Sequence, residues 1–372
     1  MRTICALLAL VATSLAGEAD DAFARELFAR VAAREGNVVC SPLSVKVALA
    51  MVYGGARGPT AAEMAKVLRC DEGIHAALAA LVKDYDGRPR GEVATPALAN
   101  AAWVQAGAPL LPTYVDLVTK HYGAPPEALD FGAADAACRR INGWVLERTR
   151  DRIREIVNPG MFNPNTTLVL ANALHFKAAW QEPFEARVTM EQPFTLASGE
   201  KVSVPFMART EHFKYADVGG AQAVELPYEG RRFSMVVILP PAGAAAALPE
   251  GLLAALDGRK VAVLLPRFRF ETGLRLDETL AAMGMKSAFG RDADFSGMTG
   301  GKDLFISAVV HKAMIAVDEK GTEAAAATAA VLEWKGEAAN PVVFRADRPF
   351  LFALRDGETG TILFLGRVSD PR

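Results

Sequence analysis

The sequence predicts a single α+β domain, because helical and strand-like patterns occupy different parts of one chain. Apolar residues recur at helical spacing early in the sequence, and apolar runs of strand length dominate its later part. Of the 372 residues, 51% are hydrophobic and 23% are charged, which is typical of a folded globular protein. The length would also allow two or three domains of about 150 residues each. No repeat and no linker rich in proline, serine or glycine divides the chain, so we expect one large core.

Four segments have the spacing of amphipathic helices. The first follows a cap at Asp20 or Asp21 and ends at Gly36, and the second ends at Gly54 and Gly55. The residues that define the four helices are Phe23, Leu27 and Val31; Val45, Leu49 and Val52; Ile141, Trp144, Val145 and Arg148; and Leu280 and Met283 after Asp277.

Three later patterns predict strands. The run from Phe233 to Leu239 is apolar almost throughout, which predicts a strand covered on both faces. Arginines alternate with phenylalanines up to Phe270 in the stretch 265–270, which predicts a half-buried strand. Residues 351–355 and 361–367 flank a turn with two glycines and predict a hairpin.

Residues 1–16 have the features of a secretory signal peptide. Arg2 carries a positive charge, residues 4–12 form an apolar run, and Ser14 and Ala16 are small, so we expect cleavage after Ala16. The alternative is an apolar first helix of a cytosolic protein. Cleavage would give a secreted, extracellular protein. At least one thiol would then be free, because an odd number of cysteines remains: Cys40, Cys70 and Cys138.

Charge and motifs exclude several function classes. The chain has 43 acidic and 41 basic side chains, a net charge of −2, so we expect no nucleic-acid partner that relies on bulk charge. No segment is long and apolar enough to span a membrane, and we expect no membrane partner. We find no metal-ligand spacing, phosphate-binding loop or serine-hydrolase motif. The sequence therefore predicts no catalytic residue, metal or cofactor, although an enzyme with scattered catalytic residues stays open as a rival class.

Residues 318–341 carry the most informative pattern. A strand-like run, Ile306–Val317, is followed by the sequence 319–322, by small residues from Ala324 to Ala330 and by a charged tip. Helical propensity would make Glu323–Leu332 a helix, but this stretch has no apolar stripe with which to pack on a core. In a strand, alternate small side chains would share one face that could enter a packed sheet. Those side chains are Thr322, Ala324, Ala326, Thr328 and Ala330.

The segment resembles the hinge and reactive-centre loop of serpins, the serine protease inhibitors. Five further segments resemble serpin signatures in the expected order, so the likeness runs from about Asp20 to the C-terminus. These segments are Asn37–Ser44, Gly54–Thr60, Leu168–Trp180, Pro349–Phe352 and Phe364–Val368.

The resemblance implies one domain over residues 17–372 with the serpin fold: three β-sheets, eight or nine helices and an exposed reactive-centre loop at about 319–341. It implies a protease inhibitor with no catalytic group of its own and no cofactor. In that family a protease cleaves the loop and forms an acyl-enzyme. The freed hinge, here Thr322 to about Leu332, then inserts as a strand of the main sheet and traps the protease.

The resemblance also locates the bait. In the family, the residue before the cleaved bond usually lies sixteen positions after the hinge glutamate, here Glu319, so the bond would be Lys335–Gly336. A lysine at this position suits trypsin-like serine proteases, which carry an acidic residue in the specificity pocket. A register one residue shorter would make Trp334 the bait and point to chymotrypsin-like targets.

Further positions match supporting residues of the family. Ser41, Ser44, Asn172 and His311 match the shutter, the polar cluster under the sheet that must part for insertion. Trp180 matches the breach, where the hinge first enters. Arg267 matches a basic residue that pairs with the hinge glutamate. The hinge itself comprises Glu319, Gly321, Thr322, Ala324, Ala326, Thr328 and Ala330.

Other readings remain open. A non-inhibitory serpin would usually have bulky, charged or proline residues in the hinge, and the inward positions here have none. Inhibition of cysteine proteases by the same loop is a further alternative. Activation by a heparin-type glycan is not expected, because basic residues between Ala61 and Arg90 are mixed with acidic ones. We expect a monomer whose partner is a trypsin-like protease.

Overall fold

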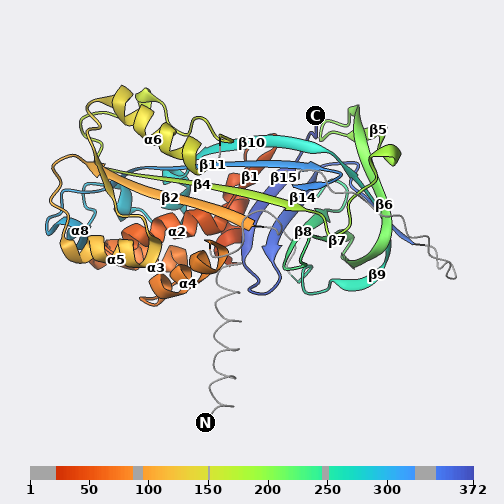
Figure 1. The fold of residues 1–372 in the computed structure, drawn as a ribbon, viewed down its shortest axis with the longest axis horizontal. Coiled ribbons are helices and arrows are strands. Elements are labelled where there is room, and N and C mark those ends of the chain that lie inside the picture. The colour runs from red at the N-terminus through yellow and green to blue at the C-terminus, as the bar shows by residue number, and fades with distance from the viewer. Residues whose placement is uncertain (1–21, 87–94, 150, 245–250, 323–340) are drawn as a thin grey trace, which may run out of the picture.

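The computed structural model describes residues 22–86, 95–149, 151–244, 251–322 and 341–372 (Figure 1). In this part of the chain, eight α-helices pack with two large β-sheets. None of the helices within it is long and apolar enough to cross a membrane. The expected signal peptide lies outside the described residues.

All four predicted helices are present, and the eight α-helices of the described residues agree with the expected count of eight or nine. Helix α2 begins after Ser41, whose Oγ accepts a hydrogen bond from the Ser44 N–H, and it has a proline in its first turn. The α-helices cover residues 22–31, Pro42–Tyr53 (α2), Gly58–Leu68 (α3), Ile74–Asp86 (α4), Pro112–Tyr122 (α5), Ala134–Arg148 (α6), Asp277–Met283 (α7) and Ser296–Thr299 (α8). Short 3₁₀ helices cover Pro159–Met161 (η1), Ala186–Val188 (η2) and Ser287–Phe289 (η3).

Six strands form one sheet in the order β10-β11-β12-β4-β2-β3. The two long central strands, β4 and β11, run parallel to each other, and β2 and β10 flank them in antiparallel pairing. The strands are β2 (Thr95–Gln105), β3 (Glu127–Leu129), β4 (Leu168–Ala179), β10 (Phe268–Arg275), β11 (Ile306–Asp318) and β12 (Gly321–Thr322).

Nine strands form the other sheet in the order β1-β15-β14-β8-β7-β6-β9-β13, with β5 paired to β6. The expectation of three separate sheets is therefore corrected to two in the described part of the chain. The 18-residue strand β6 is the reason, because it pairs in turn with β5, β9 and β7 and joins strands that would otherwise form separate sheets. The strands are β1 (Val38–Cys40), β5 (Met190–Thr195), β6 (Lys201–Val218), β7 (Ala221–Pro227), β8 (Phe233–Leu239), β9 (Asp257–Pro266), β13 (Val342–Arg345), β14 (Phe350–Asp356) and β15 (Ile362–Val368).

Two of the three strand predictions are confirmed. Strand β8 is buried along its whole length, and β14 and β15 form the predicted antiparallel hairpin. The single strand predicted over residues 265–270 is wrong: β9 ends at Pro266, β10 begins at Phe268, and Arg267 lies between them. The chain changes sheets at this point: the Arg267 N–H still donates to the Pro205 carbonyl of β6 at 3.0 Å, and from Phe268 onward the chain pairs with β11.

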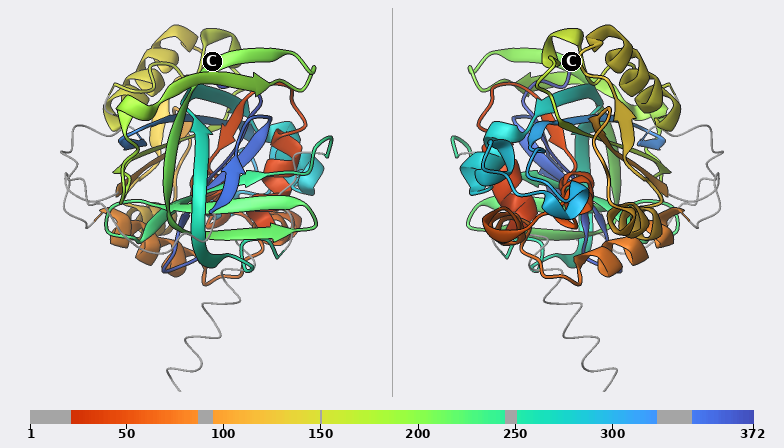
Figure 2. Two further views of the ribbon diagram at one scale, coloured as in Figure 1. Left: turned by 90° about the vertical axis from the view of Figure 1, so that its right-hand side faces the viewer. Right: turned by 90° about the vertical axis from the view of Figure 1, so that its left-hand side faces the viewer.

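Helix α2 lies between the two sheets, and α6 covers the opposite face of the six-stranded sheet (Figures 1 and 2). Eleven of the 12 residues of α2 are buried. On the other face, Ile141 of α6 shares an apolar cluster with Val169 of β4 and Val310 of β11. The strands β4 and β11 are therefore enclosed by a helix on each face.

Candidate functional site

The strands β4 and β11 separate at one end, and the start of the hinge fills the gap between them. Up to Leu174 and Ala313 the two strands pair directly. Beyond that point β12 lies between them, with Thr322 opposite Ala178 of β4 and Val317 of β11. Gly321 and Thr322 run antiparallel to both neighbours. The candidate functional site is this split together with the polar cluster beneath the paired part.

Backbone hydrogen bonds fix the hinge in the split. The Trp180 N–H donates to the Lys320 carbonyl at 2.9 Å, and the Phe184 N–H donates to the Glu319 carbonyl at 2.8 Å. Gly321 has a φ of +150°, and a Cβ at this position would lie 2.1 Å from the Ala178 carbonyl oxygen. The close approach to β4 therefore requires glycine at position 321.

Thr322 is buried in the split, with 1% of its surface exposed. Its Oγ1 lies 2.6 Å from the hydroxyl oxygen of Tyr228, which is itself fully buried. The Tyr228 ring stacks on the Trp180 indole with 4.5 Å between centroids. Burial raises the pKa of Tyr228, so its hydroxyl stays protonated and can donate. Sequence reasoning missed Tyr228, because no local pattern distinguishes it from a core aromatic residue.

Glu319 lies at the mouth of the split. Its carboxylate accepts hydrogen bonds from the Arg267 Nε at 2.7 Å, from the Arg267 Nη2, and from the Thr189 Oγ1 at 2.5 Å. Burial on its own would raise the pKa of Glu319, but the hydrogen bonds from Arg267 and Thr189 outweigh it and the pKa is lowered. The structure thus brings together the pair expected from the sequence and adds Thr189, which the sequence did not suggest.

Trp180 lies beside the same turn. Its indole Nε1–H donates to the Asp318 carbonyl at 2.9 Å, and the residue is 3% exposed. Trp180 therefore contacts the last residue of β11 through its indole and the hinge through its backbone N–H.

The polar cluster beneath the sheet centres on His311 of β11, which is fully buried. The Ser41 N–H donates to His311 Nε2 at 3.0 Å, so Nδ1 carries the ring proton and donates to Asn172 Oδ1 of β4. The Asn172 amide in turn donates to the Val310 carbonyl at 3.3 Å. Burial lowers the pKa of His311 to about 4, so the ring is neutral at physiological pH.

The two serines join this cluster to α2. The Ser41 Oγ caps the helix, and the Ser44 Oγ donates to Asn100 Oδ1 of β2 at 3.3 Å. Ser41, Ser44, Asn172 and His311 thus lie together beneath the pairing of β4 and β11, and Asn100 is a further member that sequence reasoning missed. Any opening of this pairing breaks the hydrogen bond between His311 and Asn172.

Several predicted site residues lie outside the described residues. They are Ala324, Ala326, Thr328 and Ala330 of the hinge, the bait residues Lys335 and Gly336, and the alternative bait Trp334. The described chain stops at Thr322 in the six-stranded sheet and resumes at Pro341, next to β13 in the nine-stranded sheet.

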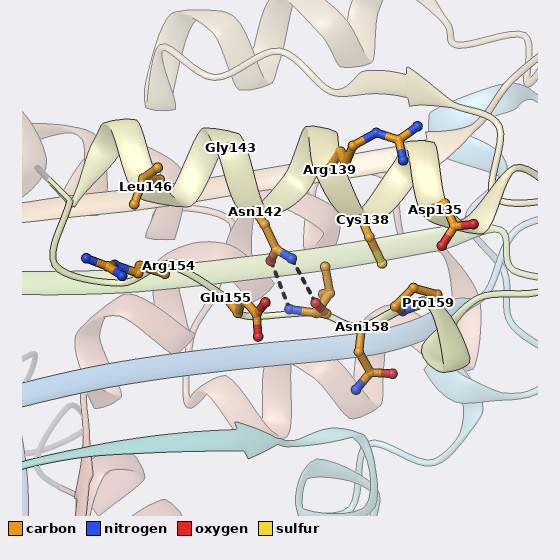
Figure 3. A pocket seen from close by; sticks show the side chains of 11 residues that line it. Asp135, Cys138, Arg139, Asn142, Gly143, Leu146, Arg154, Glu155, Asn158 and Pro159 are labelled. Atoms are coloured by element: carbon orange, nitrogen blue, oxygen red, sulfur yellow. Dashed lines mark hydrogen bonds between the residues drawn. The ribbon is translucent and has the colours of Figure 1, made fainter.

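A hollow of about 440 Å³ lies between α6 and the segment that follows it. Figure 3 shows the side chains that line it. The Asn142 side chain holds the two together, because it bonds the Ile156 N–H, the Val157 N–H and the Val157 carbonyl. Burial raises the pKa of the Cys138 thiol at its wall, which makes it a poor nucleophile. Within the described residues, no group of three or more metal-ligating side chains could hold an ion.

Comparison with known proteins identifies the family. The family model for serpins (serine protease inhibitors) matches residues 18–371. A serpin-like protein of Thermococcus kodakarensis is 41% identical over 370 residues, which cover 95% of this chain and 85% of that protein. The leukocyte elastase inhibitor of Bos taurus is 39% identical over 375 residues, or 95% and 98% of the two chains. The crystal structure of Serpin48 from Tenebrio molitor superposes with a TM-score of 0.84 at 31% identity and covers 96% of this chain and 98% of that one.

The chain therefore belongs to the serpin family of serine protease inhibitors. Its α+β fold is the serpin fold, as the superposition shows. Members of the family are named as inhibitors that act on proteases, so the chain belongs to an inhibitor family and is not an enzyme.

Proposed function

We propose that this chain inhibits trypsin-like serine proteases by inserting its cleaved loop into the split between β4 and β11. The carrying observation is that Gly321 and Thr322 already occupy the open end of the gap in antiparallel register with both strands. The rest of the segment can follow without a change of direction.

Continuing this register predicts where each later residue would pair. Thr328 would lie opposite Asn172 on one side and His311 on the other, and Leu332 would lie opposite Leu168, the first residue of β4. Twelve residues from Gly321 to Leu332 would thus cover the 12 residues of β4. The stretch from Gly321 to Leu332, which contains the small-residue run, therefore matches the length of the strand it would pair with.

Insertion also requires no sliding of β4 along β11. His311 is directly opposite Asn172 in the closed parallel pair, and the continued register keeps these two residues opposite each other across the new strand. The strands would therefore move apart sideways by about 4.8 Å, the width of one strand. The principal barrier within the sheet would be the ladder between β4 and β11 and the hydrogen bond between His311 and Asn172.

The side-chain pattern suits this path. Because strand residues alternate between faces, residues 324, 326, 328 and 330 would share the buried face of Thr322. These residues are alanine or threonine and would fit a core already filled by α2. This is why we favour an inhibitor over a non-inhibitory serpin.

The trapping chemistry would begin as ordinary proteolysis. The protease serine Oγ attacks the Lys335 carbonyl carbon, the peptide bond breaks, and Gly336 leaves as a new amino terminus. The Lys335 acyl group remains esterified to the protease. Insertion to Leu332 would carry the ester with it and displace the catalytic serine, and a displacement of about 1 Å can reduce a rate by about 100-fold. Water would then fail to release the enzyme.

A gel experiment tests this proposal. We expect trypsin to form a complex that survives denaturing electrophoresis and to release a C-terminal peptide that starts at Gly336. Lys335→Ala is the matched control and should abolish both products. A released peptide that starts at Lys335 with a chymotrypsin-like enzyme would move the bait to Trp334, and a complex with a cysteine protease would change the target class. Cleavage without any stable complex would contradict the inhibitor proposal.

We further propose that the protein is secreted as a monomer and acts without a heparin-type glycan. Secretion is supported by the pattern of residues 1–16, and N-terminal sequencing of the mature protein should begin at Gly17. The absence of glycan activation is supported by the mixed charges around α3, where Arg69 pairs with Glu26 at 3.1 Å. Heparin should leave the inhibition rate unchanged.

A further inference from the structure

Tyr228 occupies a fixed position beside the start of the hinge. It follows β7, and its ring lies between two aromatic residues of the chain around β4. The Trp180 indole stacks on it at an angle of 8°, and the Phe176 ring meets it edge-on at 5.1 Å between centroids. Because Tyr228 is fully buried, packing holds its hydroxyl in one place.

The hydroxyl of Tyr228 and the hydroxyl of Thr322 satisfy each other. They lie 2.6 Å apart, and both residues are buried. In the described part of the chain, neither of the two side chains makes any other hydrogen bond. A buried hydroxyl left without a partner is unfavourable, so each residue stabilises the arrangement in which the other is present.

The register at this position fixes the face on which every later side chain of the segment lies. A shift by one residue would move every later side chain to the opposite face and would place Glu323 on the core side. Gly321 acts against such a shift, because any other residue opposite Ala179 would bring a Cβ against the Ala178 carbonyl oxygen. Gly321 excludes wrong registers but offers no attraction of its own, whereas Tyr228 does.

We propose that Tyr228 is a positioning residue for loop insertion: its hydroxyl holds Thr322 opposite Ala178 and sets the register in which the rest of the segment enters. The role of Tyr228 in insertion rests on the proposed function. The anchoring of the resting hinge is independent of any protease. Thr322 keeps the same neighbours before and after insertion in the continued register, so this bond persists as a fixed starting point.

Hydrogen exchange on the uncleaved protein tests the anchoring directly. Tyr228→Phe and Thr322→Val each remove one hydroxyl and nearly conserve shape. We expect each variant to speed amide exchange at Gly321 and Thr322 by about tenfold, which corresponds to the loss of one hydrogen bond. The double variant removes both hydroxyls, leaves neither unsatisfied, and should exchange more slowly than either single variant.

Tyr114→Phe is the matched control. Tyr114 of α5 is also buried and donates a hydrogen bond to the Met51 carbonyl at 3.2 Å, but it is remote from the hinge in the fold. This variant should leave exchange at residues 321–322 unchanged. An equal effect of Tyr114→Phe would overturn the inference, as would unchanged exchange in both hinge variants or additive effects in the double variant.

The stoichiometry of inhibition tests the consequence. With trypsin, Tyr228→Phe and Thr322→Val should each consume more inhibitor per trapped protease, because delayed insertion allows deacylation, and the double variant should consume no more than either single variant. Unchanged stoichiometry in the single variants would overturn the role in insertion. If the wild-type protein traps no protease while the exchange results hold, the proposed inhibitory function fails and the anchoring of the hinge by Tyr228 stands.

Discussion

Acidification should weaken the closed sheet at His311. Burial lowers the pKa of this histidine to about 4, whereas an exposed histidine in an unfolded chain titrates near 6.5. Its Nε2 already accepts the Ser41 N–H, so a second ring proton would remove this acceptor and place a charge in the core. The difference between the two pKa values corresponds to about 3 kcal/mol in the free energy of unfolding.

The sign of this effect follows from which state binds the proton first. Above about pH 6.5 the ring is neutral in both states, and its contribution to stability is complete. Between about pH 6.5 and 4 the unfolded chain is protonated and the folded one is not, so the free energy of unfolding falls as the pH falls. At about pH 5 the expected loss is about 2 kcal/mol, which urea unfolding at neutral and acidic pH would measure.

His311→Gln separates this residue from the carboxylates that titrate in the same range. Glutamine offers an acceptor and a donor but does not titrate, so the variant should lose about 2 kcal/mol less than the wild type between pH 7 and 5. Nuclear magnetic resonance of the ring should give a pKa well below 6. A ring that titrates near 6.5, or equal losses in the two proteins, would refute the reasoning.

Three other perturbations act on the hinge. Thr322→Arg should convert the inhibitor into a substrate, because a buried unpaired charge costs about 3–5 kcal/mol; an undiminished yield of stable complex on gels would contradict insertion. Gly321→Ala should expel the hinge at a cost of about 1–3 kcal/mol, seen as faster amide exchange at residues 321–322; unchanged exchange would exclude the close contact with Ala178. Glu319→Gln should lower the free energy of unfolding by about 1 kcal/mol, a small value because Arg267 is 42% exposed. The contribution of Glu319 should be complete above about pH 4.3 and lost as the pH falls through its lowered pKa, so a Glu319→Gln variant as pH-sensitive as the wild type below pH 4.3 would oppose this assignment.

Local patterns were sufficient for most of the fold. The buried strand β8 and the hairpin of β14 and β15 follow from apolar runs and turn residues that are close in sequence. The helices follow from their spacing in the same way. The break at Arg267 was missed because alternation on either side of it is continuous, and the change of sheet depends on partners elsewhere in the chain.

The candidate site was only partly accessible from the sequence. The hinge and the shutter could be located by resemblance to a family, and the structure brings the described members together. Tyr228, Thr189 and Asn100 could not be found in this way. Tyr228 meets Thr322 across 94 residues and Thr189 meets Glu319 across 130, so only the folded chain shows that these side chains share a site.

In the proposed mechanism, the same contacts explain why insertion would be favourable although the closed sheet is stable. The closed state joins β4 and β11 by one parallel ladder, whereas an inserted segment would form two antiparallel ladders, one with each strand. Antiparallel pairing is also slightly more stable per residue than parallel pairing. At the shutter, Thr328 would arrive between His311 and Asn172, so its hydroxyl could replace the bond that opening breaks. The closed state would thus persist because β4 and β11 must move apart sideways before the new ladders can form. At one end, hinge residues already lie in the gap, so less further separation is needed there.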